Sequence, residues 1–273
     1  MRHRTFRAFL LLGLVGVLVA GLTGCPIRPL TYKDTVRVAL DFLPNGPLNI
    51  TNDSGAITIS GWDEDQLSIR ATKQIQIGYW PLREPEYYLN ALKVNVSGDE
   101  NGVNIVTAFP RNLLLEGVTP SIDYNIKAPS SLVLDILNDN GDITVTDIAG
   151  TIRVEVHEGN VAVERSMLPD AGDSIACDVD VGDVDITLPE GSSFFIDAST
   201  NFGTVDSGDF QIPIDFVLLH PRMYGTTGDG DATINAGVSI GDIRLHMGEA
   251  PGEGEGEGEG EGEGEGEGEG EAA

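Results

Sequence analysis

The aspartates Asp178, Asp180, Asp183 and Asp185, grouped around Gly182, are the residues of this chain whose spacing best suits chemistry. On an extended strand, residues two apart lie on one face, about 6.6 Å from each other. This distance falls in the range of about 6.5–9.5 Å that separates the two carboxyl groups of inverting glycosidases. A general acid also needs a pocket that raises its pKa. Here glycines surround the aspartates, and no aromatic residue lies nearby in the sequence to hold a sugar. The sequence therefore nominates no catalytic residue, and a β-helix carbohydrate-active enzyme is a remote alternative.

Calcium binding is a second chemistry that these acidic residues could support, because Ca²⁺ takes six to eight oxygen ligands. The tandem Gly-Gly-x-Gly-x-Asp nonapeptide of calcium β-rolls is absent, and so is the twelve-residue helical loop that ends in glutamate. Aspartate and asparagine beside glycine are ordinary turn formers. We therefore expect turns rather than metal sites, and no cofactor other than Ca²⁺ is considered. The candidate ligands for Ca²⁺ are Asp139, Asp142, Asp178, Asp180, Asp183, Asp229 and Asp231.

The remaining histidines and cysteine do not form a motif. His157, His220 and His246 are far apart and lack the spacing of metal ligands. If Cys25 is consumed as described below, Cys177 has no disulfide partner in the chain. We expect Cys177 to be a small buried residue rather than a nucleophile.

These candidate residues lie on a chain that reads as strands almost throughout. From Thr35 onward, Val, Ile and Leu recur at every second position, which is typical of half-buried strands. One stretch departs from this pattern: Glu84–Leu92 predicts a short helix with Pro85 in its first turn. After Pro129 the chain repeats a unit in which a turn of Asn, Asp and Gly precedes Ile or Val at alternate positions.

The spacing of the turns predicts the fold class. Turn glycines at 141, 159, 182 and 203 are about 20 residues apart, as in the stacked coils of a repeat protein. The sequence therefore predicts an all-β, single-stranded β-solenoid or β-helix-like body. An antiparallel β-sandwich is the alternative, because alternation alone does not separate the two folds. The apolar row from Phe210 to Leu218 interrupts the repeats and predicts an inserted edge strand.

The N-terminus predicts export and membrane attachment. Arg2, Arg4 and Arg7 precede an apolar run that is shorter than a membrane-spanning helix and ends in small residues, as in a secretory signal peptide. The run ends in Leu22-Thr23-Gly24-Cys25, which resembles the lipobox of bacterial lipoproteins. This resemblance implies cleavage before Cys25, lipidation of that residue, and a location at the cell membrane or outer membrane. Two or more acyl chains would hold the protein firmly.

Charge limits the partners. The chain has 44 acidic and 16 basic residues and a formal net charge of −28, and ten of the glutamates alternate with glycine near the C-terminus. Such a surface repels nucleic acid, and the Gly-Glu tail is expected to be disordered and expanded. We divide the sequence into a signal peptide at 1–24, a tether at 25–34, an N-terminal β region at 35–128, β repeats at 129–248 and a disordered tail at 249–273.

Two blocks carry a family resemblance. Residues 50–62 (ITNDSGAITISGW) and 135–145 (DILNDNGDITV) resemble the repeated Asn-x-x-Gly-x-Ile-x-Val units of the bacterial "putative adhesin" domain, which is related to the head-GIN domain. The resemblance covers about residues 35–247 and implies a β-rich, solenoid-like envelope domain without established catalytic residues. It favours a non-enzymatic lipoprotein that contacts a surface polysaccharide or an envelope protein. The alternative is an envelope stress or regulatory scaffold that binds a membrane protein.

Overall fold

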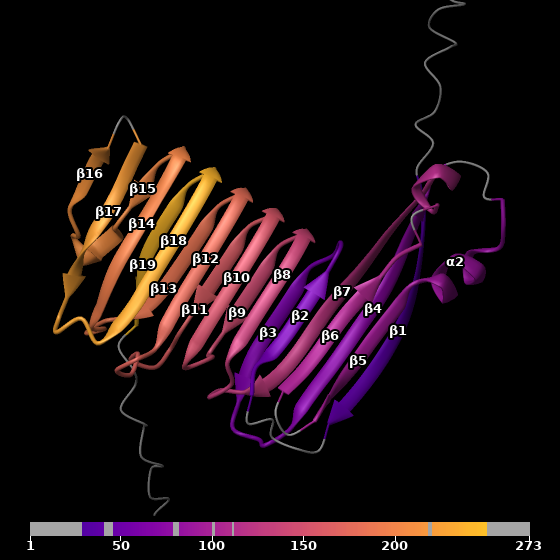
Figure 1. Ribbon diagram of the computed structural model, residues 1–273, viewed down its shortest axis with the longest axis horizontal. Coiled ribbons are helices and arrows are strands. Elements are labelled where there is room, and N and C mark those ends of the chain that lie inside the picture. Colours follow the sequence, from indigo (N-terminus) through magenta and orange to yellow (C-terminus); the bar gives the residue numbers. More distant parts are fainter. Residues whose placement is uncertain are drawn as a thin grey trace, which may run out of the picture.

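The computed structural model describes residues 29–40, 46–78, 82–99, 102–110, 112–217 and 220–249. These residues form two stacked β-sheets that wind together along one long axis (Figure 1). The nine-stranded sheet runs in the order β1 (Leu30–Leu40), β4 (Leu67–Ile77), β7 (Val118–Pro129), β3 (Ile57–Trp62), β9 (Ile143–Thr146), β11 (Val161–Glu164), β13 (Val184–Pro189), β19 (Ile243–Gly248) and β15 (Val205–Asp206).

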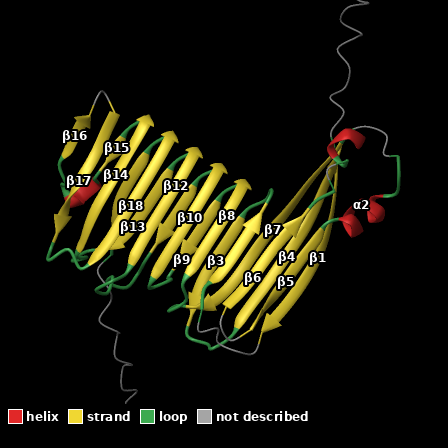
Figure 2. Ribbon diagram, in the orientation of Figure 1, coloured by secondary structure: helices red, strands yellow, loops and turns green. Residues whose placement is uncertain are grey.

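The second sheet has ten strands in the described part of the chain. Its order is β16 (Ile214–Val217), β17 (His220–Thr227), β14 (Phe194–Phe202), β18 (Ala232–Ile240), β12 (Ser174–Val181), β10 (Thr151–Glu158), β8 (Leu134–Asn140), β2 (Leu48–Asn52), β6 (Gly102–Ala108) and β5 (Lys93–Asp99). Helical segments are short and peripheral: α2 (Pro85–Ala91) and the 3₁₀ turns η1 (Leu114–Glu116) and η2 (Gly208–Phe210) (Figure 2).

The repeats form a solenoid. Each coil contributes one strand to each sheet, and neighbouring coils pair in parallel, as in β8–β10–β12 and β9–β11–β13. This confirms the solenoid prediction, and the antiparallel sandwich is wrong for the repeats. Antiparallel pairs occur at the two ends, in β1–β4–β7 and β5–β6 at one end and β14–β17–β16 at the other.

The coils do not stack in chain order. The chain runs from the β12–β13 coil to β14 and β15, turns back through β16 and β17, and then inserts the β18–β19 coil into the gap between β12–β13 and β14–β15. The edge strand predicted for the row from Phe210 to Leu218 is present in part as β16, which forms one edge of the ten-stranded sheet, whereas Phe210 lies in η2. The last coil in the sequence therefore lies inside the stack of coils and not at the end of the stack.

The core lies between the sheets and consists of rows of branched aliphatic side chains. One row joins equivalent positions of successive coils through Ile57, Ile143, Val161, Val184 and Ile243, all buried. Burying such a side chain contributes roughly 1.5–3 kcal/mol. The alternate residues point outward and form the two broad outer faces.

Two predictions at the N-terminal end have different outcomes. The helix predicted over Glu84–Leu92 is confirmed as α2, with Pro85 as its first residue. The tether predicted for residues 25–34 is wrong in its second half, because β1 begins at Leu30 and pairs with β4 along its whole length. In β1, Lys33 and Asp34 interrupt the alternation of apolar and polar residues. Antiparallel pairing with the long strand β4 nevertheless extends β1 through this segment.

Candidate functional site

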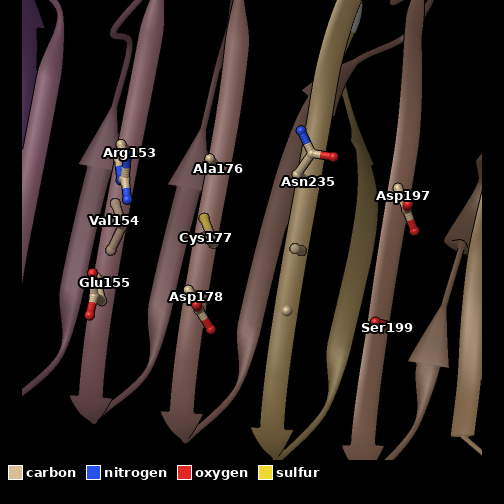
Figure 3. Close-up of a pocket in the computed structure, with 11 residues that line it drawn as sticks. Arg153, Val154, Glu155, Ala176, Cys177, Asp178, Asp197, Ser199 and Asn235 are labelled. Carbon is tan, nitrogen blue, oxygen red and sulfur yellow. The ribbon is translucent and has the colours of Figure 1, made fainter.

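A depression lies on the outer face of the ten-stranded sheet, where outward side chains of β10, β12, β18 and β14 meet (Figure 3). It has a volume of about 450 Å³, and we call it the outer groove. Its outward-facing lining residues are Arg153, Glu155, Ala176, Asp178, Asp197, Ser199, Asn235 and Gly237. The strands pair in parallel, so equivalent positions stand side by side and build a surface that crosses several coils.

The groove exists because its floor is made of small residues. Ala176 and Gly237 lie between the longer side chains of β10 and β14. Gly237 is in the middle of β18, where an added Cβ would meet Asp178 Oδ1 at 3.6 Å, an ordinary contact. Its φ is outside the left-handed region, so backbone geometry does not require glycine here. Glycine weakens a strand interior, and its presence at this position leaves the groove open.

One side of the groove is fixed by an ion pair. Arg222 Nε donates to Asp197 Oδ1 at 2.7 Å, and its Nη2 donates to Asp197 Oδ2 at 2.5 Å. The guanidinium lies over the Tyr224 ring, 4.8 Å from its centroid, and the hydrogen bonds to Asp197 raise the Arg222 pKa. This arrangement places a half-exposed aromatic ring beside the groove.

A second depression of about 230 Å³ continues the groove across the strands towards β8. It shares Glu155 and Asp178 with the outer groove and adds Asp139, His157 and Asp180. The His157 Nδ1 and Asp180 Oδ2 atoms lie 2.6 Å apart, and the hydrogen bond to this carboxylate raises the His157 pKa. The surface is thus polar and carries charges of both signs.

The aspartates that are grouped in the sequence are divided between the two sheets. Asp178 and Asp180 share the outer face of β12, as their spacing predicts. The turn at Gly182 then carries the chain to the other sheet, where Asp183 and Asp185 lie. The four carboxylates therefore do not converge on one reacting centre.

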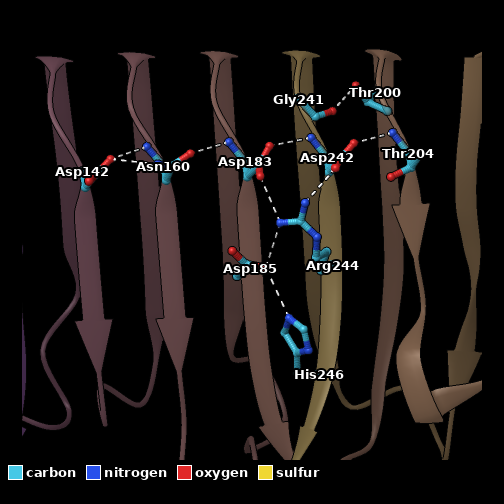
Figure 4. Close-up of polar contacts among 10 residues, drawn as sticks. All are labelled: Asp142, Asn160, Asp183, Asp185, Thr200, Thr204, Gly241, Asp242, Arg244 and His246. Carbon is cyan, nitrogen blue, oxygen red and sulfur yellow. Dashed lines mark hydrogen bonds and ion pairs between the residues drawn. The ribbon is translucent and has the colours of Figure 1, made fainter.

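Side chains at the turns between the sheets form a second polar feature, a hydrogen-bonded ladder that crosses the coils (Figure 4). Asp142 Oδ1 accepts the backbone N–H of Asn160 at 2.8 Å, and Asn160 Oδ1 accepts that of Asp183 at 2.9 Å. Asp183 Oδ1 accepts the N–H of Asp242 at 2.9 Å, and Asp242 Oδ1 accepts that of Thr204 at 2.8 Å. These residues are turn formers, as the sequence indicates for Asp142 and Asp183.

Arg244 neutralises part of this ladder. Its guanidinium donates to Asp183 at 3.0 Å and to Asp242 at 2.7 Å, and it lies 3.5 Å from Asp185. The backbone N–H of Thr204 and then Arg244 hold the Asp242 pKa below its usual value. His246 Nε2 lies 3.2 Å from Asp185. The carboxylates of this face are therefore occupied within the protein.

The calcium hypothesis gains no support from these positions. Asp229 and Asp231 lie in the turn between β17 and β18, where their backbone N–H groups donate to Ser193 Oγ. Among the described residues, no group of three or more His, Cys, Asp and Glu side chains is placed to hold a metal ion. Asp139, Asp178 and Asp180 lie instead along the outer groove and its continuation.

The prediction that Cys177 is buried is confirmed. It is part of an inward row with Val154 and Ala236, directly beneath the groove floor, and burial raises the pKa of its thiol to about 12. An unfolded cysteine ionises near pH 8.5, at about its ordinary pKa. Since the folded pKa is the higher one, the stability that the neutral thiol contributes is complete below about pH 8.5 and is lost as pH rises towards 12.

We therefore expect Cys177 to be inert to iodoacetamide at pH 8 in the folded protein and to react promptly in denaturant. Mass spectrometry of time points with and without urea measures this difference. Rapid alkylation of the folded protein would contradict the burial of the thiol. The chain would then have an accessible nucleophile next to the groove.

Residues that the sequence analysis did not single out make up most of the outer groove. Ala176, Asp197, Ser199, Asn235 and Gly237 carry no recognisable motif. Gly237 is the one residue whose sequence position could have indicated the groove. An isolated glycine inside a strand pattern suggests a bulge or a close approach of another group.

A comparison of the sequence with known protein families gives a match. The Toastrack DUF4097 family matches residues 90–246, more than half of the chain. The chain belongs to the Toastrack DUF4097 family. The matched segment contains the coils that build the outer groove and the turn ladder. A comparison with curated proteins gave no match.

One solved structure shares the β architecture of this chain. A putative cell adhesion protein from Clostridium sporogenes is 15% identical, with a TM-score of 0.50, and the alignment covers 81% of this chain and 100% of that one. A putative adhesin from Bacteroides fragilis is 8% identical, with a TM-score of 0.31, over 78% of this chain and 97% of that one. At 15% identity, the likeness to the Clostridium sporogenes protein shows a shared fold and nothing further.

The expectations for the two ends of the chain concern residues outside the described part. They are the signal peptide, the lipidation of Cys25 and the Gly-Glu tail from Gly252 onward. None of the helices in the described residues is long and apolar enough to span a bilayer.

Proposed function

We propose that this protein is a non-enzymatic, lipid-anchored protein of the bacterial cell envelope, whose repeat domain binds a surface polysaccharide along the outer groove. The observation that carries the proposal is Gly237, a glycine that the backbone does not require and that keeps the floor of the groove open. A solved structure with this fold, described as a putative cell adhesion protein, agrees with a role in surface contact. The lipobox-like Cys25 would supply the attachment.

The chemistry of the groove favours an uncharged glycan. Carboxylates, an amide and an arginine line a shallow polar surface, and the half-exposed Tyr224 ring, contacted by Arg222 and Phe195, lies beside it. Sugar hydroxyls can donate to carboxylates such as Asp178 and accept from Arg153. The acidic balance of the chain disfavours anionic polymers. A glycan chain laid across the strands would make many moderate contacts with several coils.

The variant Gly237→Thr tests this proposal. Threonine fits a strand well and its side chain would fill the groove floor, so we expect at least a tenfold loss of polysaccharide affinity with an unchanged or higher melting temperature. Binding is measured by biolayer interferometry on envelope polysaccharides extracted from the producing bacterium.

Ser239→Thr is the matched control, because Ser239 lies on the same face of β18 two residues beyond the groove. It should bind like the unchanged protein. Equal affinity of Gly237→Thr and the parent protein would contradict the groove as the binding site. Capture of an envelope protein instead of a glycan, lost in Gly237→Thr, would assign the same groove to a protein partner and overturn the polysaccharide assignment.

A further inference from the structure

The N-terminal end of the nine-stranded sheet projects beyond the rest of the molecule. β1, β4 and β7 are 11, 11 and 12 residues long, whereas β9 and β11 have four residues each. Asp123 of β7 is level with the row of turns, because its Oδ1 accepts the N–H of Ala56. β7 begins at Val118, five residues earlier. At about 3.3 Å per residue, its start lies roughly 16 Å beyond the turns.

The projecting tip carries exposed leucines. Leu30, Ile77 and Val118 pair side by side at the ends of their strands, and η1 directly precedes Val118. Leu30 is 62% exposed, and Leu114 and Leu115 of η1 are 67% and 90% exposed. Figure 1 shows the start of β1, the end of β4 and the helical turn before β7 together at this tip.

A fourth leucine is fixed in the same place. Leu82, 76% exposed, precedes α2. The buried Tyr88 hydroxyl faces both the backbone at Leu82 and the side chain of Glu116 in η1, and burial, followed by this carboxylate, raises the Tyr88 pKa. Tyr88 is thus buried near both the segment before α2 and the η1 turn, although its hydroxyl and Glu116 Oε2 have no hydrogen-bond partner among the described residues. We call Leu30, Leu82, Leu114 and Leu115 the tip leucines.

We propose that the tip leucines insert into the interfacial region of the bilayer to which Cys25 is anchored. This inference rests on the lipid anchor proposed above. Only residues 26–29 separate Cys25 from Leu30, so the extended chain reaches at most about 17 Å and keeps the start of β1 close to the membrane. Four clustered leucines on a projecting tip suit insertion about 5–10 Å deep, where apolar side chains leave water while flanking polar groups stay among the headgroups.

The tip itself carries the acidic residues Glu84, Glu86 and Glu116 beside the tip leucines, whereas the acidic turn ladder lies further away. The acidic ladder residues Asp142, Asp183 and Asp242 lie at the turns, roughly 16 Å behind the tip. This is more than the Debye length of about 8 Å at physiological ionic strength, so their repulsion of anionic lipid is largely screened. The guanidinium of Arg83 lies 4.2 Å from the Tyr87 ring centroid beside the tip, where it can reach headgroup phosphates. With the tip inserted, strands β1, β4 and β7 would stand on the membrane and hold the outer groove away from it.

The experiment uses the lipidated full-length mature protein in vesicles of phosphatidylethanolamine and phosphatidylglycerol. Leu115→Cys is labelled with an environment-sensitive fluorophore; Cys177 is buried and does not compete for the label. We expect a blue shift on vesicle binding and quenching by lipids that carry a nitroxide close to the headgroup. Met167→Cys is the control, because Met167 is also apolar and is 53% exposed, but it lies in the loop after β11, at the opposite end of the strands.

Each outcome decides a specific point. Quenching at position 115 but not at 167, reduced when Leu82 and Leu114 are both replaced by serine, supports insertion of the tip. Vesicle-bound, lipidated protein with no quenching at position 115 overturns the inference and leaves the anchor standing. Protein that carries no lipid at Cys25 and floats free of vesicles overturns both the anchor and the inference. Leu82 and Leu114 are exposed, so their replacement should leave the fold intact, which circular dichroism checks.

Discussion

Replacing Gly182 by alanine is expected to lower the free energy of unfolding by about 3 kcal/mol or more, a large part of the stability of a domain. Gly182 has φ +146°, a conformation that costs a residue with a side chain on the order of 1–3 kcal/mol. An added Cβ would also lie 2.0 Å from the carbonyl oxygen of Gly159 in the neighbouring coil. Because that oxygen belongs to the backbone, the two coils would have to move apart.

Gly237→Ala is the matched control for this prediction. It makes the same chemical change one coil away, but in extended backbone and with an ordinary contact of 3.6 Å. We expect it to be neutral or slightly stabilising. Thermal melts followed by circular dichroism compare the two variants, and a loss of 3 kcal/mol corresponds to a fall in Tm of about 6–12 °C for a domain of this size. Similar melting temperatures for the two variants would contradict the role given to Gly182.

Gly182 is one member of a row of glycines, which explains both the success and the limit of the sequence analysis. Gly141, Gly159, Gly182 and Gly241 stack at the turns, and an added Cβ on each would collide with the carbonyl oxygen of a neighbouring glycine. The spacing of glycines in the sequence predicts turns and hence a solenoid. It does not show that the turns touch one another, because that contact arises only when coils stack about 4.7–4.9 Å apart.

The same turns explain why the acidic cluster was misleading. Asp178 and Asp180 are two residues apart, as are Asp183 and Asp185, and in the sequence the two pairs form one acidic cluster around Gly182. Gly182 directs the second pair to the other sheet, where Arg244 and the turn ladder occupy it. A local pattern of spacing carries no information on which side of a bend each residue lies.

The outer groove could not be read from the sequence because it depends on the order of the coils. Gly237 and Asn235 of β18 stand between Asp178 of β12 and Asp197 of β14 only because the last coil inserts between earlier ones. If the coils stacked in chain order, β12 would pair with β14 and the small floor residue at 237 would lie at the end of the stack. Residue propensity and spacing identify the strands. They do not show the order in which the coils stack, because that order depends on tertiary contacts between strands far apart in the sequence.

Asp173→Ala is expected to destabilise the protein by about 3–5 kcal/mol, the usual cost of leaving a buried charge without its partner. Arg165 and Asp173 close the base of the loop between β11 and β12, and their side chains are 3% and 12% exposed. Arg165 Nη1 donates to Asp173 Oδ2 at 2.9 Å, and Nη2 donates to the Gly150 carbonyl oxygen at 2.7 Å. Burial lowers the Arg165 pKa, and Asp173 opposes this shift. The Asp173 carboxylate therefore offsets part of the free-energy cost of burying the charged guanidinium.

A double-mutant cycle separates this coupling from simple loss of packing. Arg165→Met removes the charge but keeps much of the volume, so the double variant with Asp173→Ala should recover most of the stability lost in Asp173→Ala alone. Asp173→Asn should fall between the parent and Asp173→Ala, because it can keep a hydrogen bond to the guanidinium without the charge. Urea unfolding measures all five proteins: the parent, the three single variants and the double variant. A cost below about 1 kcal/mol for Asp173→Ala, or a double variant no more stable than the single one, would show that the pair behaves as an exposed ion pair and that the loop base is open to water.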